Sequence, residues 1–218
     1  MSGKMETALR AVGERWLTVD QAMIYEEAAG RRGYFLAKRI FDLVFASLVI
    51  AGILSWLLPF LALLIKLDSK GPAFFVQQRM GRYSRPFRCY KLRSMVNGRV
   101  TRLGGWLRRA HLDELPQFFN VLFGAMSIVG PRPYMLADCR RFAELVPDGN
   151  FRYRVRPGIT GMAQAKGLHG AVSGAAGKDR QVIVERYQWD AYYVRYAGFR
   201  MDMRILGRTV KLLLGWKG

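Results

Sequence analysis

Two carboxylates stand side by side at Asp113 and Glu114, and Pro116 follows them closely. Proline is tolerated within an α-helix only in the first turn, because it has no backbone N–H to donate. The sequence therefore predicts a helix over residues 114–124, with Asp113 near its N-cap and Glu114 in its first turn. The positive end of the helix dipole favours ionised carboxylates at this place. Taken alone, such an acidic pair is typical of a helix cap.

Basic residues flank this acidic pair on both sides. Arg102, Arg108 and Arg109 precede it, and Arg132 follows it. If these side chains converge, the site suits a magnesium-bound diphosphate, because carboxylates bind the hard cation and guanidinium groups bind phosphate oxygens. A carboxylate can also attack phosphorus and form a covalent acyl phosphate. The chain has no Walker loop and no GxGxxG motif, so we expect side chains to hold the phosphates.

The composition of the chain indicates a polyanionic partner. Its 218 residues are 51% hydrophobic, and 35 Lys and Arg against 16 Asp and Glu give a formal net charge of +19. Such an excess is typical of proteins that bind nucleic acid, anionic lipid or phosphorylated substrates. No nucleic-acid-binding motif accompanies the charge, so we expect no nucleic-acid partner. The isolated His111 and His169, and the distant Cys89 and Cys139, provide no zinc-site pattern.

A long apolar run is the strongest structural signal in the chain. Residues 43–65 include no charged residue, and about 20 apolar residues suffice to cross a bilayer. Pro59 lies past the middle of the run, where it kinks a helix. Basic residues flank the run on both sides, Lys38 and Arg39 among them, so the positive-inside rule selects no orientation. These residues leave open a re-entrant helix or a kinked transmembrane helix. Asp42 at its edge is expected to pair with a nearby basic group such as Arg39.

The rest of the chain predicts a mainly α-helical fold with a small β-hairpin. Residues 73–93 read as two strands around a turn, the second with alternating apolar and basic side chains. Residues 199–214 form a basic amphipathic pattern, which suits a helix in the membrane interface or one packed on the core. Residues 1–33 indicate an amphipathic helical preamble, and the Gly- and Ala-rich residues 167–177 are expected to be mobile. Other helices are expected over 101–110 and 134–146.

Several motifs occur in order along the chain. They are KRIFD at 38–42, GPAFF at 71–75, KLRSM at 91–95, LDELPQ at 112–117, NVL at 120–122, MSIVGPRP at 126–133 and RPGITG at 156–161. Together they resemble the bacterial sugar transferase family, the monotopic phosphoglycosyl transferases. The resemblance covers residues 37–210.

The resemblance implies transfer of a sugar 1-phosphate from a UDP-sugar to a polyprenyl phosphate such as undecaprenyl phosphate, with release of UMP. It implies that Asp113 attacks the β-phosphorus and forms a covalent phosphosugar intermediate, and that Glu114 binds an essential Mg²⁺. This reaction is the first membrane step of polysaccharide or glycoconjugate assembly. The positions at which the resemblance implies substrate contacts are Lys91, Arg93, Arg132, Arg156 and Asp190.

For the fold, the resemblance implies a membrane-embedded monotopic domain with interfacial amphipathic helices. The apolar helix is then re-entrant and broken near Pro59, with Lys38 and Arg39 at its membrane entry. The location is the cytoplasmic face of the bacterial inner membrane, whose lipids are partners; self-association into a homo-oligomer stays open. The expected segments are an amphipathic extension over 1–36, a re-entrant membrane helix over 37–68 and a catalytic domain with interfacial helices over 69–218.

The chain also departs from the family pattern near the acidic pair. Ala125 stands where the family often has Asp, and Val76 and Gln78 stand where it often has Arg and Glu. Leu58 replaces the usual Ser before the membrane proline, although Ser55, one turn back, can satisfy a freed carbonyl. Because acids are lost at two positions, a catalytically impaired, membrane-anchored scaffold is the competing hypothesis. No residue identifies the sugar, whose selection depends on a few small contacts.

Overall fold

The computed structural model describes residues 30–146, 149–168 and 177–215, and this part of the chain is mainly helical with small two-stranded sheets. The predicted mainly α fold class is confirmed at this level. Most of the predicted preamble and of the Gly- and Ala-rich segment lies outside the described residues.

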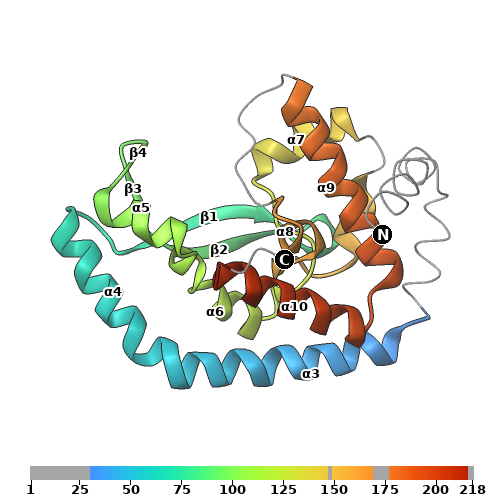
Figure 1. Cartoon of the computed structure of the whole chain (residues 1–218), viewed down its shortest axis with the longest axis horizontal. Helices are drawn as coiled ribbons and strands as arrows, with labels where there is room; N and C mark the ends of the chain where they lie inside the picture. The colour runs from blue at the N-terminus through green and yellow to red at the C-terminus, as the bar shows by residue number, and fades with distance from the viewer. Residues whose placement is uncertain (1–29, 147–148, 169–176, 216–218) are drawn as a thin grey trace.

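The apolar run forms one helical stretch whose geometry changes in the middle. Helix α3 (Arg32–Val49) passes through a π-helical turn (Ile50–Leu54) into α4 (Ser55–Asp68), which contains Pro59. In Figure 1, α3 runs along one edge of the molecule and α4 turns away from its end. A proline ring conflicts with the carbonyl four residues before it, and a π turn is a common way to absorb such a conflict. The predicted distortion is therefore present, and it begins at Ile50, nine residues before the proline.

Side chains satisfy carbonyls that the π turn frees from regular α-helical bonding. Ser55 Oγ donates to the Ala51 carbonyl at 2.7 Å, and Trp56 Nε1 donates to the Gly52 carbonyl at 3.1 Å. Ser55 therefore does satisfy a carbonyl one turn back, as expected, and that this compensates for the missing family serine stays a prediction. These bonds matter because an unsatisfied carbonyl is costly in an apolar environment.

The helical stretch from α3 to α4 has one buried face and one exposed apolar face. Along α3 exposed large apolar residues recur every four positions up to Leu48, with Phe45 beside them, and the next one is Ile53, five positions later. The π turn supplies this extra residue, so the apolar stripe continues on one side of both helices. The members of the exposed stripe are Leu36, Ile40, Val44, Leu48, Ile53, Trp56, Phe60, Leu63 and Leu67.

The predicted β-hairpin is confirmed and lies next to the acidic pair. Strand β1 (Phe74–Met80) pairs antiparallel with β2 (Pro86–Leu92), and the register places Phe75 opposite Lys91 and Arg79 opposite Phe87. Arg79 and Lys91 therefore share one face of the hairpin, since residues in register or two apart point to the same side. The small hairpin of β3 (Met95–Val96) and β4 (Arg99–Val100) then leads into α5 (Arg102–Arg109), which the Thr101 side chain caps by accepting from Gly104 N.

The C-terminal half packs around a short parallel strand pair. Strand β5 (Ser127–Val129) lies beside β6 (Gly158–Thr160), and a Cβ built on Gly158 would lie 2.1 Å from the Gly130 nitrogen. Glycine is therefore required at this close approach of two backbones. The other elements are α6 (Gln117–Leu122), α7 (Leu136–Leu145), a 3₁₀ segment (Gly149–Arg154), α8 (Met162–Ala165), α9 (Gly177–Tyr196) and α10 (Phe199–Leu213).

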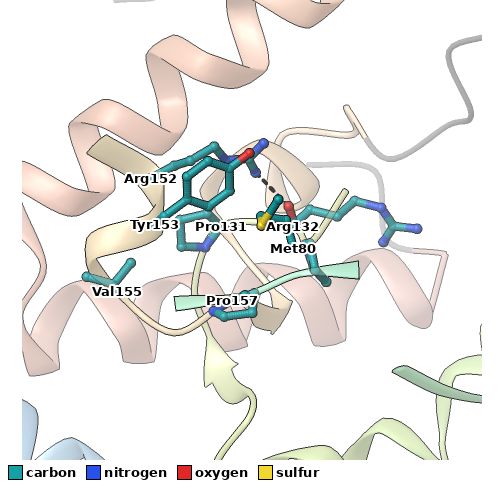
Figure 2. Close-up of a pocket in the computed structure, with 9 residues that line it drawn as sticks. Met80, Pro131, Arg132, Arg152, Tyr153, Val155 and Pro157 are labelled. Atoms are coloured by element: carbon teal, nitrogen blue, oxygen red, sulfur yellow. Dashed lines mark hydrogen bonds between the residues drawn. The ribbon is translucent and has the colours of Figure 1, made fainter. Parts of the chain in front are cut away.

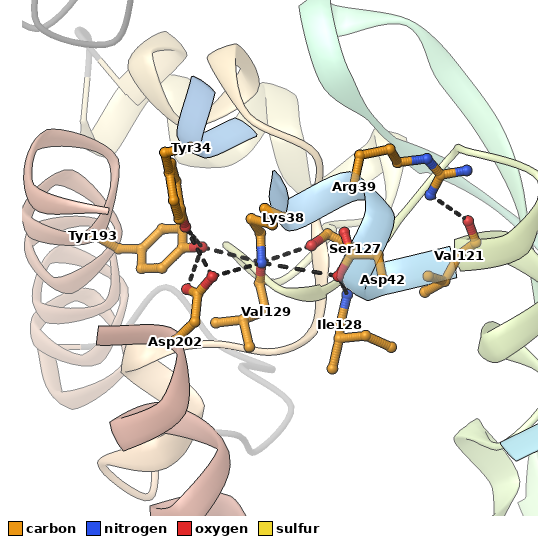
Figure 3. Close-up of polar contacts among 10 residues, drawn as sticks. All are labelled: Tyr34, Lys38, Arg39, Asp42, Val121, Ser127, Ile128, Val129, Tyr193 and Asp202. Carbon is orange, nitrogen blue, oxygen red and sulfur yellow. Dashed lines mark hydrogen bonds and ion pairs between the residues drawn. The ribbon is translucent and has the colours of Figure 1, made fainter. Parts of the chain in front are cut away.

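A buried polar cluster joins the start of the apolar helix to the C-terminal helices (Figure 3). Lys38 Nζ lies 2.9 Å from Asp202 Oδ2, and Tyr34 and Tyr193 each donate to an Asp202 oxygen, at 2.8 and 2.9 Å. Asp42 accepts from the Ile128 N–H at 3.0 Å, which ties α3 to β5. These contacts fix the orientation of α3 relative to the rest of the fold.

The expected basic neighbour of Asp42 is present, but it is Lys38 and not Arg39. Lys38 is the nearer cation, 3.9 Å from Asp42, because it lies one turn before it on the same face of α3. Arg39 points elsewhere and donates to the carbonyls of Val121 and Leu122 at 2.7 and 3.1 Å (Figure 3). A cation there complements the negative end of α6.

Candidate active site

Asp113 and Glu114 lie in a separate 3₁₀ turn, Leu112–Glu114, and not in the first turn of a helix. The following helix, α6, begins only at Gln117, with Pro116 at its N-cap. The predicted start of this helix is therefore too early, although the proline does mark its beginning. His111 has a left-handed backbone, with φ 56°, and its carbonyl accepts from Glu114 N at 3.3 Å. This reversal turns the two carboxylates toward the β-hairpin.

Glu114 makes two ion pairs through a single oxygen. Lys91 Nζ lies 2.6 Å from Glu114 Oε1, and Arg132 Nη2 lies 3.2 Å from the same atom. Burial by itself would raise the pKa of Glu114, but the charges of Arg132 and Lys91 outweigh it and hold that pKa well below its usual range. Glu114 is therefore ionised at any physiological pH.

Asp113 has a different environment from its neighbour. It is only 9% exposed, and burial raises its pKa above the ordinary value, an effect that the positive charge of Lys91 opposes and that of Glu114 reinforces. Two adjacent carboxylates whose pKa values are shifted in opposite directions are a recurring feature of catalytic sites. The structure thus keeps Glu114 ionised, whereas the ionisation of Asp113 depends on the balance between its burial and the neighbouring charges.

Arg79 also belongs to this site, and the sequence interpretation missed it. Its Nη1 donates to the Pro133 carbonyl at 2.6 Å, and its pKa is lowered by burial and by the nearby charge of Arg132. The available signal was the alternation in the hairpin, which places Arg79 and Lys91 on the same face. Arg79, Lys91 and Arg132 together form a cationic wall around Glu114.

Of the three basic residues that precede the acidic pair, Arg108 has an electrostatic effect on Asp113. Its positive charge lowers the pKa of Asp113, while its Nη1 contacts Met95 Sδ at 2.9 Å. Arg102 and Arg109 are exposed on α5. The predicted convergence of basic groups on the carboxylates therefore involves Arg108 and Arg132 from the predicted set.

Three other residues expected to contact substrate are held elsewhere by protein groups. Arg93 donates to the carbonyls of Ser69 and Lys70, each at 2.7 Å, at the end of α4. Arg156 Nε donates to the Gly124 carbonyl at 2.9 Å. Asp190 is buried on α9, 2.9 Å from a nitrogen of Arg152. The structure does not bring these three together with Glu114, and their substrate contacts stay predictions.

A small pocket lies behind Arg132, between the segment 130–133 and the 3₁₀ segment Gly149–Arg154 (Figure 2). It encloses about 10 Å³, which is room for about one water molecule. The side chain of Arg132 leads away from this pocket and toward Glu114, whereas its carbonyl faces Arg152. The pocket is too small for a nucleotide, so the chemistry belongs to the outer side of Arg132, where the carboxylates lie.

The donor set at the carboxylates fits a divalent cation that binds partly through substrate. Within the described residues no group of three or more His, Cys, Asp and Glu side chains could hold a metal ion. Mg²⁺ is commonly held by one or two carboxylates together with substrate phosphates and water. Asp113 and the ionised Glu114 supply oxygens of this kind, and Glu114 Oε2 is the oxygen not used by the two ion pairs above.

Comparison with known proteins places this site in a family context. The sequence profile described as "Bacterial sugar transferase" matches residues 33–215, which includes every residue of the site. The chain is 44% identical over 191 residues to the exopolysaccharide production protein PSS of Rhizobium leguminosarum bv. phaseoli, covering 79% of this chain and 92% of that protein.

Two further relatives carry more specific names. The UDP-glucose:undecaprenyl-phosphate glucose-1-phosphate transferase of Caulobacter vibrioides is 40% identical over 193 residues, covering 82% of this chain and 70% of that protein. The UDP-N-acetylgalactosamine-undecaprenyl-phosphate N-acetylgalactosaminephosphotransferase of Aeromonas hydrophila is 38% identical over 195 residues, covering 83% of this chain but only 44% of that protein. These relatives share a reaction type and differ in sugar.

Proposed function

Because the chain belongs to the bacterial sugar transferase family, we propose that it transfers a sugar 1-phosphate from a UDP-sugar to undecaprenyl phosphate, releases UMP and so initiates polysaccharide assembly. The observation that carries the proposal is the arrangement around Glu114. A buried Asp113 stands beside an anionic Glu114, and Lys91 and Arg132 line the same place. This combination suits a substrate that brings a diphosphate to a carboxylate nucleophile.

In the first step, a carboxylate oxygen of Asp113 attacks the β-phosphorus of the UDP-sugar. A bond forms between that oxygen and phosphorus, the bond from phosphorus to the oxygen bridging the two phosphates breaks, and UMP leaves with the bonding electron pair. Lys91, Arg132 and Arg79 supply positive charge for the phosphate oxygens, on which negative charge develops. Burial keeps Asp113 poorly solvated, which favours its use as a nucleophile over a fully hydrated carboxylate.

In the second step, a phosphate oxygen of undecaprenyl phosphate attacks the same phosphorus. The bond to Asp113 breaks, the carboxylate is regenerated, and the product is a polyprenyl diphosphate sugar. When bound, Mg²⁺ would neutralise diphosphate charge, and Glu114 with Asp113 would hold it. The low pKa of Glu114 keeps this ligand anionic throughout both steps.

The proposed location of the chemistry is the membrane surface, where the acceptor phosphate lies. The helical stretch Arg32–Asp68 is long and apolar enough to enter a bilayer, and its exposed stripe of nine large apolar side chains faces away from the fold. The bend between α3 and α4 supports a re-entrant course, and the exposed apolar Phe199, Val210 and Leu213 support an interfacial place for α10. The cytoplasmic face is proposed because UDP-sugars are cytoplasmic metabolites.

One assay tests the transferase and separates it from a scaffold. Purified full-length protein is mixed with Mg²⁺, undecaprenyl phosphate and a panel of UDP-sugars, including UDP-glucose and UDP-N-acetylgalactosamine, and UMP is measured. We expect UMP release with one or a few sugars and loss of that release in Asp113→Asn. Glu144→Gln, a change of the same type at an exposed position on α7, serves as the control that retains activity. No UMP with any sugar would favour the scaffold, and release that survives Asp113→Asn would remove Asp113 as the nucleophile.

Membrane topology needs a separate test. Single cysteines are placed before α3 and after α4, at Gly30 and Lys70, and labelled with a membrane-impermeant thiol reagent in oriented vesicles; both native cysteines are replaced by serine. A re-entrant helix exposes both positions on the same side, whereas a spanning helix exposes them on opposite sides. Opposite labelling would defeat the re-entrant proposal without affecting the transferase proposal.

A further inference from the structure

The segment Pro131–Pro133, which carries Arg132, has few backbone N–H groups with which to form hydrogen bonds to neighbouring strands. Pro131 and Pro133 lack a backbone N–H, so this segment cannot form a regular ladder of hydrogen bonds with a neighbour. Its three consecutive carbonyls, from Pro131, Arg132 and Pro133, accept hydrogen bonds instead. The donors are the Gly158 N–H at 3.0 Å, Arg152 Nη2 at 2.6 Å and Arg79 Nη1 at 2.6 Å, respectively.

Arg152 makes the central one of these three contacts, directly on the backbone of Arg132. It is buried, only 3% exposed, and its guanidinium lies over the rings of Tyr134 and Tyr187, at 4.0 and 4.8 Å from their centroids. The same nitrogen, Nη2, also lies 2.9 Å from Asp190 Oδ2. Asp190 and the two rings thus fix the guanidinium in one position. Its hydrogen bond to the Arg132 carbonyl, shown in Figure 2, then fixes that carbonyl.

The chain of contacts then continues to the carboxylates. The Arg132 carbonyl faces Arg152, and its side chain faces Glu114, with Nη2 3.2 Å from Oε1. Arg132 is thus held at its backbone carbonyl and at the end of its side chain, so its guanidinium keeps one position. Positive charge fixed in advance in this way stabilises an anion that develops during a reaction.

We infer that Arg152, held in place by Asp190, is a positioning residue that sets Arg132 against Glu114 and the substrate diphosphate. This inference rests on the transferase function proposed above. It gives Asp190 a role different from the substrate contact expected from the sequence: the carboxylate acts through Arg152 and the Arg132 backbone. The alternative is that the pair only stabilises the packing of α9 against the segment Gly149–Arg154.

A double-mutant cycle separates the two roles. Arg152→Lys keeps the charge but loses the planar group that lies over the rings of Tyr134 and Tyr187, and it is made in the wild-type chain and in Arg132→Met. We expect Arg152→Lys to lower the rate of UMP release by about 10- to 100-fold in the wild type. In the Arg132→Met background, where the side chain it positions is gone, we expect a change of less than about twofold.

The matched control is Arg31→Lys, since Arg31 is also a guanidinium that donates to backbone carbonyls, those of Val194 and Ala197 at the end of α9. It lies outside the site, so its effect on the rate should be the same in both backgrounds. If Arg152→Lys does not yield folded protein, Asp190→Asn takes its place in the cycle, because it leaves Arg152 intact and should couple to Arg132→Met in the same way.

Equal loss of rate in the two backgrounds, for whichever of these two variants folds, would overturn the inference and leave packing as the role of the pair. That outcome leaves the transferase proposal standing, because the wild type still releases UMP. Absence of UMP release from the wild type with every sugar would overturn the function, and this inference with it.

Discussion

Lys91 Nζ and Glu114 Oε1 lie 2.6 Å apart, and this ion pair joins strand β2 to the turn that carries both carboxylates. The same lysine is also the largest charge that lowers the pKa of Asp113, against the effect of burial. One cation on the hairpin therefore acts on both members of the acidic pair: it neutralises Glu114 and helps to ionise Asp113.

Lys91→Met should shift the pH dependence of the reaction. The proposed nucleophile is the ionised form of Asp113, whose pKa burial raises and Lys91 lowers. Removing Lys91 therefore raises this pKa further, and the acid limb of the profile of kcat/KM, which reports groups in the free enzyme, moves to higher pH. Lys166→Met, at an exposed position directly after α8 where the ammonium lies over the Trp189 ring, should leave the limb unchanged. An acid limb that stays in place in Lys91→Met would argue against Asp113 as the titrating group.

Glu114→Gln should increase the Mg²⁺ concentration needed for half-maximal UMP release, by about tenfold or more. The amide has nearly the shape of the carboxylate but lacks the negative charge that a hard cation requires. Titrating Mg²⁺ at fixed substrate concentrations measures the change. Glu185→Gln, at an exposed carboxylate that accepts from Trp189 at 3.3 Å, is the control. An unchanged Mg²⁺ dependence in Glu114→Gln would exclude Glu114 as a metal ligand.

The buried pair of Lys38 and Asp202 should show strong coupling in stability. Asp202→Leu leaves the buried Lys38 with only the more distant Asp42, 3.9 Å away, so it should lower the free energy of unfolding by about 3 kcal/mol, the lower end of the loss for an unpaired buried charge. The double variant Lys38→Met/Asp202→Leu should recover part of this loss, since both charges are then gone. Unfolding in detergent measures the effect, with Arg204→Met, exposed on the same helix, as the control. Additive losses in the double variant would show that the two residues stabilise the fold independently.

Two glycine substitutions should have opposite effects. A Cβ at Gly158 would lie 2.1 Å from the Gly130 nitrogen and 2.3 Å from the Thr160 carbonyl oxygen, and backbone atoms of a strand pair cannot move aside cheaply. Gly158→Ala should therefore abolish folding or activity. Gly207 in α10 has nothing within 4 Å of its Cβ position, so Gly207→Ala should stabilise the helix by about 0.5–1 kcal/mol. Expression level and thermal unfolding of the two variants test this pair.

Helices and strands that have a clear hydrophobic period, and clear residues at their ends, could be predicted from the sequence. The hairpin, α5, α7 and α10 form close to their expected bounds, because alternation, a Thr cap and amphipathic spacing are local signals. Helix α9 was missed, although Ile183, Tyr187, Ala191 and Val194 are buried at helical spacing. Its charged and aromatic residues surround the helix and obscure that stripe, since Arg186, Asp190 and Tyr193 are buried rather than exposed.

The site was predictable in its chemistry and less so in its geometry. Four of the predicted residues do lie together: Asp113, Glu114, Lys91 and Arg132. Their residue types and the motifs that contain them were enough to select them from the sequence. Which oxygen pairs with which cation depends on the 3₁₀ turn and on a left-handed His111, neither of which has a strong local signal. The positions of Arg79 and Arg152 depend on contacts to backbone carbonyls far along the chain, which a single sequence does not encode visibly.

The five-residue step between Leu48 and Ile53 has a consequence for how this helix tolerates changes in length. A wide π turn contains one residue more than an α turn while it keeps nearly the same rotation. Deleting one residue within Ile50–Leu54 would convert the turn to α-helix and still leave Trp56, Phe60 and Leu63 in phase with Val44 and Leu48. Deleting one residue within α4, beyond the turn, would instead rotate everything after it by about 100°. The exposed apolar surface of this helix therefore depends on the rotational phase of its residues, and the π turn is the one place along the helix where a change in length leaves that phase nearly unchanged.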